Sequence, residues 1–456
     1  CPLSWVQSRI LPDLRGYADP GGFNMRREIY LLAMFIFIYN INLNIIDNGD
    51  SVPASLLPFN ILENHNLTLD YFSEYFDTIP VPWMVKKPGS HLLSVYPIVT
   101  PVLVTPLYII PYLIIKVAHY PMDPLNPSFW LIVDILEKIA ASIVAALSGV
   151  FIYLAARKLI REQAAIVTAI FFAFGTNTWA TSSQQLWQHG LSELILAMLL
   201  YIIFTNNNTE KDLLAMGALS GLFVFNRPAD SILLLPILYY VLKSDNRLYY
   251  AVGCATGMPF AAYNLYYFGS IMGGMEILFG ALNIYNIINA LGLLVSPNRG
   301  ILIYSPIVVL AVFGYFKSRR DPFCNLMVLS ILAEIAIYGS FAIWWSGGSY
   351  GPRFMTGMFP YIAIFMGLYI NTLSMKKNKL AIFCISILFA WSVFVQIVGV
   401  AYPYWLWAQA ADIDTARAWD WQDMEIFTVF YAGPIEIHPL EGLKTFLADC
   451  AHQTPG

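Results

Sequence analysis

The stretch IYLLAMFIFIYNINLNIIDNGDS, residues 29 to 51, joins an apolar run to two carboxylates, Asp47 and Asp50. A helix of about 20 apolar residues crosses the hydrocarbon core of a bilayer, and about 17 suffice. Residues 29 to 46 meet that length, so the sequence predicts a first membrane span that ends beside an acidic turn. Two interpretations of the carboxylates stay open. They form either an Asx-type turn that closes the helix or a catalytic base.

The whole chain has the composition of an integral membrane protein. Of its 456 residues, 58% are hydrophobic and 12% are charged, and the mean hydropathy is +0.61. A soluble domain of this size could not bury so much apolar surface. The net charge of −4 and the lack of a long basic run leave no electrostatic footprint for nucleic acid, which we exclude as a partner. The five cysteines show no disulfide framework.

Apolar segments predict an all-α protein with about eleven membrane helices. These are residues 29–46, 135–156, 163–181, 190–204, 212–226, 229–243, 248–267, 300–316, 323–345, 354–374 and 380–400. One further apolar stretch, residues 94–118, contains four prolines. If it crossed the bilayer, the basic residues at 157–161 and the later basic loops would lie on the same side as Asp50, against the positive-inside rule. We therefore expect it to lie in the interface or to dip in and return.

This topology divides the chain into three parts. Residues 1–28 form a cytoplasmic segment, residues 29–400 form the transmembrane domain, and residues 401–456 form a tail outside the cytoplasm. The loop 47–134 is the longest one between spans. Within it, the apolar stripe of SVPASLLPFNILENHNLTLDYF (51–72) predicts a helix that lies on the membrane plane. We expect a multi-pass protein of the plasma membrane whose chemistry faces the outside.

Unusual cations gather on the outer side of this topology. The long loop carries Lys86 and Lys87, and later outer turns carry the single arginines Arg227, Arg299 and Arg353 near the ends of spans. A lone outer arginine often extends to lipid phosphates, and this interpretation stays open for each of them. The five cations together favour an anion site at the outer leaflet, because arginine offers phosphate a planar fork and lysine offers it a point charge.

Three further outer residues are candidates for substrate binding. His189 either caps the turn before the span at 190–204 or contacts substrate. Most outer Trp and Tyr side chains form interfacial belts. Trp345 and Tyr350, in WWSGGSYGPRF (344–354), could instead stack on a sugar or cover a lipid chain.

The order of these features resembles the GT-C superfamily of polytopic glycosyltransferases. A first span ends in an acidic residue and a long outer loop follows. That loop has a Lys-Pro in KKPGSHLLSVYP (86–97), and ARKL (156–159) lies at the inner end of the next span. The resemblance covers roughly residues 25 to 400. It is closest to the aminoarabinose transferases and protein O-mannosyltransferases that use polyprenyl-phosphate sugars.

The resemblance implies a catalytic aspartate at position 50. Asp50 opens DSVPASLLPFNILENHNL, and its spacing to the following turn matches the family pattern better than that of Asp47. The family's Asp-Glu pair is absent because Ser51 follows Asp50. This departure weakens the case for a second carboxylate beside the base and leaves Asp47 as the candidate substitute.

The resemblance also implies a phosphate-binding lysine. Lys87 and Pro88 match a Lys-Pro-Pro motif of the family, from which Gly89 departs. Lys87 would bind the donor phosphate together with Lys86 or with one of the outer arginines.

The implied activity is that of an inverting glycosyltransferase. It would move a sugar from a polyprenyl-phosphate-linked donor to a glycan, lipid or protein acceptor at the outer face, among membrane lipids. Asp50 would take the acceptor proton, a contribution of ~10²–10⁴-fold to the rate. No cofactor and no metal site are expected. The alternative is a divalent metal with Asp47 and Asp50 as oxygen ligands.

Two rival functions stay open. A transporter or lipid flippase for an anionic substrate would need ionisable residues near the middle of the membrane, for which Glu193 and Glu334 are the candidates. The two halves of the chain show no internal repeat of transporter type, which counts against this rival. A non-catalytic scaffold subunit is the other alternative.

Overall fold

The structure is a computed structural model that describes residues 25–42, 44, 49–79, 83–205, 207–275, 287–374, 376–410 and 413–435. In these ranges the chain is mainly helical, and its strands form a single antiparallel pair, β1 (Val85–Lys86) with β2 (Leu93–Ser94). The predicted all-α class is confirmed for this part of the chain. Asp47 lies outside the described residues.

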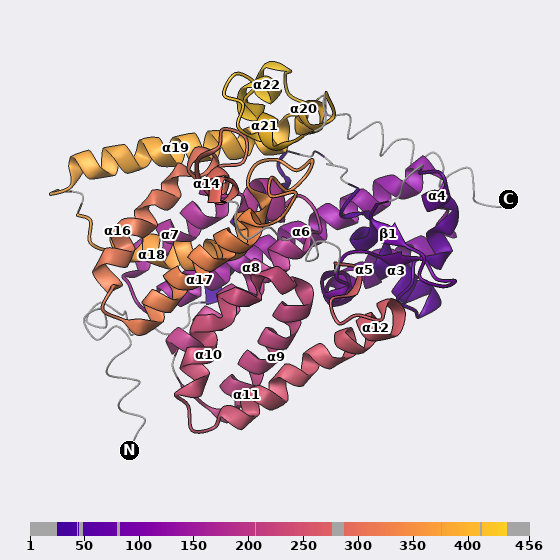
Figure 1. The fold of residues 1–456 in the computed structure, drawn as a ribbon, viewed down its shortest axis with the longest axis horizontal. Coiled ribbons are helices and arrows are strands. Elements are labelled where there is room, and N and C mark those ends of the chain that lie inside the picture. The colour runs from indigo at the N-terminus through magenta and orange to yellow at the C-terminus, as the bar shows by residue number, and fades with distance from the viewer. Residues whose placement is uncertain are drawn as a thin grey trace.

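The helices of the first half comprise α2, the helices of the long first loop and part of the bundle (Figure 1). They are α2 (Met25–Asn40), α3 (Val52–Asn64), α4 (Ser73–Asp77), α5 (Val99–Val117), α6 (Pro127–Ala156), α7 (Glu162–Gly175), α8 (Gln188–Thr205), α9 (Glu210–Asn226), α10 (Leu235–Leu242), α11 (Arg247–Gly253) and α12 (Met258–Phe268).

The second half completes the bundle and ends in a small helical tail. Its helices are α14 (Ile287–Val295), α15 (Ile301–Tyr304), α16 (Leu310–Ser318), α17 (Pro322–Gly339), α18 (Phe359–Ile370), α19 (Lys379–Ala401), α20 (Tyr404–Ala410), α21 (Thr415–Ala418) and α22 (Glu425–Tyr431). Short 3₁₀ or π segments join several elements: η2 (Asp70–Phe72), η3 (Thr178–Ser182), η4 (Pro228–Leu234), η5 (Cys254–Gly257), η6 (Gly273–Met275), η7 (Pro306–Val309) and η8 (Arg353–Met358).

Six helices of the described chain are long and apolar enough to cross a bilayer. They are α5, α6, α8, α17, the segment formed by η8 and α18, and α19. Three shorter apolar helices span Glu162–Gly175, Pro228–Leu242 and Pro306–Ser318. This composition is that of a multi-pass membrane protein. The predicted count of about eleven spans is not confirmed.

Basic residues that the topology assigns to the cytoplasm meet at one end of the bundle. Arg157, after α6, pairs with Glu28 of α2 at 2.8 Å, and Arg27 of α2 pairs with Glu162 of α7. The start of α2, the end of α6 and the start of α7 therefore lie together, as the topology requires. The side of the membrane that this end faces stays a prediction.

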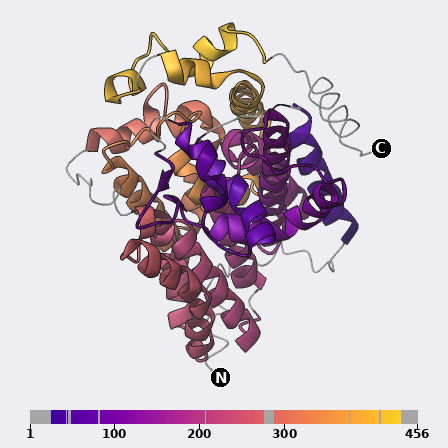
Figure 2. The same ribbon diagram turned by 90° about the vertical axis from the view of Figure 1, so that its right-hand side faces the viewer.

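The long first loop folds into a lobe beside the bundle (Figures 1 and 2). Helix α6 has 30 residues, or about 45 Å at 1.5 Å per residue, which exceeds a hydrocarbon core of about 30 Å. Its first turns extend into the lobe, where the ring of Phe129 contacts those of Phe59 and Phe72 at centroid distances of 5.5 and 6.3 Å.

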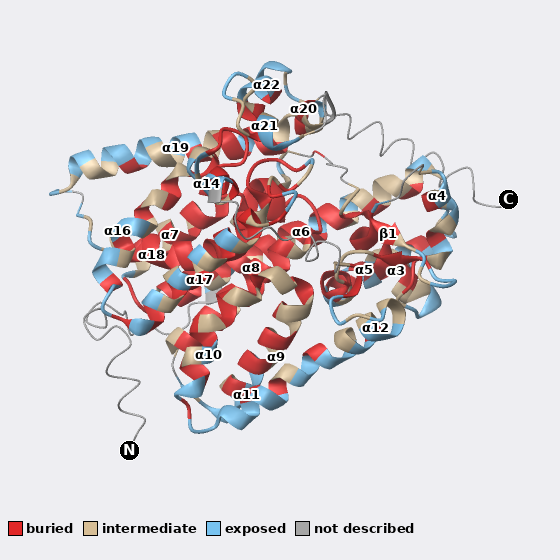
Figure 3. Ribbon diagram, in the orientation of Figure 1, coloured by how far each residue is buried: buried red, intermediate tan, exposed pale blue. Residues whose placement is uncertain are grey.

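Helix α3 differs from its predicted setting. The stretch is helical as expected, but residues Val52 to Asn60 are all buried, as Figure 3 shows for this lobe. Helices α5 and α6 pack against α3, so protein rather than lipid covers its apolar surface. A stripe of apolar residues in the sequence does not tell whether protein or lipid will cover the helix.

Helix α5 is continuous through Pro106 and Pro111. Lys116, near its C-terminal end, pairs with Glu63 near the end of α3 at 2.6 Å, so this end of α5 stays against the lobe. Its length and hydropathy would also allow a crossing. That residues 94–118 return without crossing stays a prediction.

Two glycines allow α9 and α11 to approach closely. A Cβ atom at Gly217 would lie 2.0 Å from the carbonyl oxygen of Tyr250, and one at Gly253 would lie 2.2 Å from that of Leu214. Small residues at such crossings let backbones meet, and dispersion contacts then hold the membrane helices together.

We expect Gly217→Ala to force α9 and α11 apart and to lower the free energy of unfolding by about 1–3 kcal/mol. Thermal unfolding of the purified protein in nanodiscs measures this as a lower Tm. Ala215→Leu, on an exposed position of the same helix, should leave Tm nearly unchanged. Equal Tm values for Gly217→Ala and the wild type would contradict the close crossing.

Candidate active site

The carboxylate of Asp50 is the centre of a cluster at the junction of lobe and bundle. Its Oδ2 accepts a hydrogen bond from Nη1 of Arg353 at 2.9 Å, and the two side chains form an ion pair. Its Oδ1 accepts from the hydroxyl of Tyr96 and from Nε1 of Trp83, the latter at 3.1 Å. The Asp50 side chain remains 22% exposed. The carboxylate is therefore fixed from several sides and still reachable.

The surroundings keep Asp50 ionised. Burial raises the pKa of its carboxyl group, but the positive charge of Arg353 and the hydrogen bonds from Tyr96, Arg353 and Trp83 outweigh burial. The pKa of Asp50 therefore lies below the ordinary aspartate value. At neutral pH the group is a carboxylate and can accept a proton.

The hairpin of β1 and β2 places Trp83 and Tyr96 beside Asp50. Val95 donates its backbone N–H to the carbonyl of Met84 at 3.0 Å, which extends the pairing beyond the strands. Asp50 follows Gly49, where a Cβ atom would lie 2.7 Å from the indole ring of Trp83. The backbone of this turn thus lies close against the indole, and a side chain at position 49 would displace it.

Arg353 is the first residue of η8, directly after the loop that follows α17. Its Nη2 donates to the carbonyl of Ser346 at 2.8 Å, and its guanidinium lies 4.1 Å from the ring centroid of Trp187, a cation–π contact. Its Nε is buried and has no hydrogen-bond partner. One N–H of this paired, fixed cation therefore has no acceptor in the structure.

His189 adjoins this cation through an aromatic neighbour. Its ring lies 5.8 Å from that of Trp187, it is buried, and its Nδ1 has no hydrogen-bond partner. Of the residues predicted from sequence, the structure thus brings Asp50, Arg353 and His189 into one region. It does not show His189 in contact with the carboxylate.

Arg227 contacts the chain next to Arg353. Its Nη1 pairs with Asp230 at 2.8 Å, its Nη2 donates to the carbonyl of Phe354 at 3.3 Å, and its guanidinium lies over the ring of Tyr338 at 4.9 Å. Phe354 follows Arg353 in the chain. Arg227 therefore supports the backbone next to Arg353.

Arg299, Trp345 and Tyr350 have structural contacts. Arg299 is fully buried, pairs with Glu425 at 2.8 Å and donates from Nε to the carbonyl of Trp345 at 2.7 Å. Tyr350 is buried and donates its hydroxyl to the carbonyl of Val395 at 2.9 Å. The guanidinium of Arg299 and the hydroxyl of Tyr350 are thus engaged within the protein, whereas Trp345 contributes its backbone carbonyl and its indole remains half-buried.

The two lysines lie on the lobe surface. Lys87 pairs with Asp77 at 3.0 Å, and its side chain is 51% exposed. Lys86 is half-buried in β1. In the described part of the chain, no cluster of three or more His, Cys, Asp or Glu side chains is arranged to hold a metal. The alternative with Asp47 as a ligand falls outside these residues and stays a prediction.

Sequence reasoning missed Trp83 and Tyr96 as partners of Asp50. They stand 33 and 46 residues from it in the chain, and the two strands between them have only two residues each. The Pro88-Gly89 dipeptide between them is a turn signal, and Gly89 has a φ of +70°. It could have indicated the hairpin, although not its contact with Asp50.

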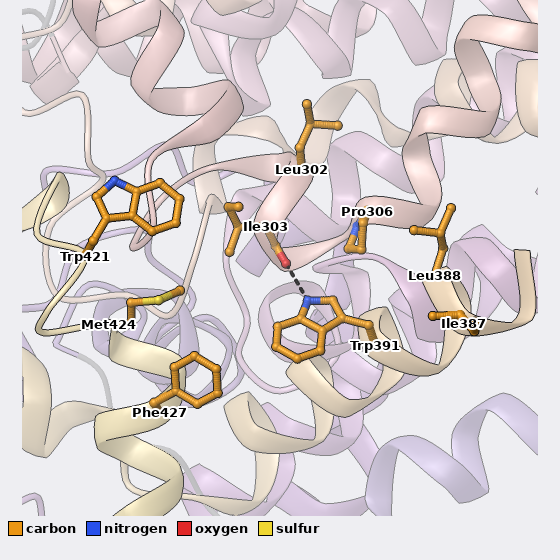
Figure 4. A pocket seen from close by; sticks show the side chains of 9 residues that line it. All are labelled: Leu302, Ile303, Pro306, Ile387, Leu388, Trp391, Trp421, Met424 and Phe427. Atoms are coloured by element: carbon orange, nitrogen blue, oxygen red, sulfur yellow. Dashed lines mark hydrogen bonds between the residues drawn. The ribbon is translucent and has the colours of Figure 1, made fainter. Parts of the chain in front are cut away.

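A separate apolar groove of about 480 Å³ lies between α15, α19 and the tail (Figure 4). Trp391, Trp421 and Phe427 contribute to its lining, and Nε1 of Trp391 donates to the carbonyl of Ile303 at 2.9 Å. The residues around Asp50 do not line this groove.

Two solved structures resemble the fold weakly. The archaeal oligosaccharyltransferase AglB from Archaeoglobus fulgidus, in complex with an inhibitory peptide and a dolichol-phosphate, matches with a TM-score of 0.47 and 11% identity over 86% of this chain. The apo form of the Archaeoglobus fulgidus oligosaccharyltransferase matches with a TM-score of 0.43 and 11% identity over 90% of this chain. The chain spans 59% and 60% of the lengths of these structures. Scores below 0.5 do not establish a common fold.

The sequence comparison is more specific. No curated protein matches the chain significantly. The family model of the dolichyl-phosphate-mannose-protein mannosyltransferases matches residues 137–267, a stretch that contains Trp187, His189 and Arg227 but neither Asp50 nor Arg353. This match confirms the resemblance of the chain to the membrane glycosyltransferases of the GT-C superfamily.

Proposed function

We propose that this protein transfers a sugar from a polyprenyl-phosphate donor to an acceptor hydroxyl at the outer face of the membrane, with inversion at the anomeric carbon. The observation that carries the proposal is the carboxylate of Asp50, which is ionised, partly exposed and paired with Arg353. The match to the mannosyltransferase family supports the reaction class. The acceptor is a glycan, a lipid or a protein.

Asp50 acts as the general base in this proposal. The acceptor oxygen attacks the anomeric carbon, its proton passes to the carboxylate, and the bond between that carbon and the phosphate oxygen breaks with its electron pair on phosphate. The leaving group is a phosphate monoester with a second pKa of about 6, so it departs as a dianion without a proton. Stabilising this departure requires positive charge nearby.

Arg353 is suited to that task. Its Nε–H is buried and has no partner, its orientation is fixed by the contact with Trp187, and its side chain is only 10% exposed. A preorganised cation in a site shielded from water stabilises developing negative charge more than a solvated one does. Lys86 and Lys87, on the lobe surface, would meet the donor phosphate on its way in.

Trp83 marks the side from which the acceptor approaches. Its indole is 60% exposed, while its Nε1 donates to the carboxylate of Asp50. An acceptor hydroxyl that reaches Asp50 past this ring would meet an oxygen already held in place. The aromatic face suits a sugar or another group with C–H bonds directed at it.

Asp50→Asn tests the base directly. An amide cannot accept the proton, so we expect the rate of transfer to fall by ~10²–10⁴-fold. The assay uses purified protein in nanodiscs, labelled sugars on undecaprenyl or dolichyl phosphate, and a mixed acceptor fraction of glycans, lipids and peptides. Asp123→Asn removes an exposed carboxylate of the same lobe and should retain activity. Wild-type rates for Asp50→Asn would remove the base assignment.

Arg353→Gln should move the acidic limb of the pH–rate profile to higher pH. In the wild type the lowered pKa of Asp50 keeps the base ionised until the solution is strongly acidic. Without the guanidinium, burial dominates and the pKa of Asp50 rises above its ordinary value of about 3.9. Activity is then lost earlier as pH falls. The residual transfer of the variant, measured from pH 4 to pH 8, checks this, and an unshifted limb would contradict it.

One observation favours the rival function of an anion transporter or lipid flippase. Glu334 is fully buried in α17, and neither of its carboxylate oxygens has a hydrogen-bond partner. Buried ionisable groups in membrane helices often mark transport pathways. Proteoliposome uptake of an anionic solute that is lost in Glu334→Gln, without any sugar transfer, would favour this rival.

A further inference from the structure

The tail after α19 is joined to the bundle by a fully buried ion pair. Arg299 and Glu425 are both 0% exposed, and Nη1 of Arg299 lies 2.8 Å from Oε2 of Glu425. The same oxygen accepts from the hydroxyl of Tyr304 at 2.6 Å and from the backbone N–H of Gly351 at 3.2 Å. One carboxylate oxygen of the tail thus connects the turn at 296–300, α15 and the loop that leads to Arg353.

The residue before Arg299 makes a second connection to the tail. Oδ1 of Asn298 accepts from the backbone N–H of Glu425 at 2.7 Å. Its Nδ2 donates to the carbonyl oxygens of Arg417, Asp420 and Asp423 at 2.8, 3.3 and 3.1 Å. The tail is therefore held by directional bonds to one dipeptide. Such bonds fix an orientation, which apolar contact alone does not.

Arg299 also binds the loop before η8, so it connects this loop to the tail. Its Nε and Nη2 donate to the carbonyls of Trp345 and Gly347 at 2.7 and 3.2 Å. Arg353 holds the carbonyl between them, that of Ser346, at 2.8 Å. Ser346 has a φ of +64°, which non-glycine residues adopt only when their surroundings impose it. Two arginines thus hold three consecutive carbonyls in a strained turn.

We propose that Glu425, acting through Arg299, is a positioning residue for Arg353, so that the tail is a working part of the active site. The inference rests on the proposed function only in giving Arg353 the donor phosphate as its ligand. Glu425 accepts a hydrogen bond from Gly351 directly. It also pairs with Arg299, which holds the carbonyls of Trp345 and Gly347. The loop then holds the guanidinium between Asp50 and Trp187. A tail that only covered apolar surface would need neither the ion pair nor these carbonyl bonds.

The test compares two buried ion pairs at different places in the fold. Glu425→Gln removes the charge that holds Arg299, and Glu28→Gln removes the partner of Arg157, a pair with side chains only 8% and 11% exposed. Full-length variants in nanodiscs are measured by thermal unfolding, by amide hydrogen exchange of residues 344–354, and by affinity for undecaprenyl phosphate.

We expect Glu425→Gln to accelerate exchange at 344–354 and to weaken undecaprenyl phosphate binding by roughly ten-fold, the scale of a lost charge-assisted bond. Glu28→Gln should lower Tm and leave both other readouts unchanged. Arg353→Lys should weaken binding, and adding Glu425→Gln to it should weaken binding little further, because both changes act on the same contact. Unchanged affinity in Glu425→Gln, or additive losses in the double variant, would overturn the proposal.

Two provisions keep the outcome interpretable. If Glu425→Gln does not fold, Tyr304→Phe takes its place, because it removes one hydrogen bond to the same carboxylate and leaves the ion pair. Tyr304→Phe should also accelerate hydrogen exchange at 344–354 and weaken undecaprenyl phosphate binding. No change in either measurement would overturn the proposal. If the wild type does not bind undecaprenyl phosphate, the donor assignment under the proposed function fails. The exchange of 344–354 then decides the positioning role by itself, and unchanged exchange in Glu425→Gln overturns it.

Discussion

The contact on which the rest of the site depends is the ion pair of Asp50 and Arg353. The two residues lie 303 positions apart in the chain, so the pair forms only when the lobe and the second half of the bundle are both in place. Removing charges from water is costly, and attraction offsets that cost only with good geometry and further hydrogen bonds. Tyr96, Trp83 and the carbonyl of Ser346 supply those bonds.

The partners of Arg353 depend in turn on a second ion pair, that of Arg299 and Glu425. Arg353 needs Ser346 in an unfavourable backbone conformation, and the neighbouring carbonyls on either side are held by Arg299. Arg299 is itself fully buried and needs Glu425 from the tail. The charges therefore form a series of dependent contacts from Asp50 in the lobe to Glu425 in the tail. Breaking one contact would leave a charge without its partner, so the contacts depend on one another.

The sequence predicted those parts of this arrangement that depend on local chemistry. Apolar length indicated the helices, and the positions of Asp50 and Arg353 beside predicted span ends marked both as candidate site residues. The sequence could not predict the ion pair of Asp50 and Arg353, because no local pattern relates residues so far apart in the chain. Arg299 and Arg353 also look alike in sequence, each a single arginine after a Gly- or Pro-containing turn. Only burial by the tail separates a fully paired cation from one that keeps an unbonded N–H.

The same pair sets the basicity of Asp50 under the proposed function. With Arg353 as its main partner, the pKa of Asp50 is low, and the carboxylate is ionised but a weak base. A donor phosphate beside Arg353 would share that cation and bring a second negative charge toward the carboxylate. Like charge raises a carboxyl pKa. Donor binding would thus strengthen the base at the moment when an acceptor can react.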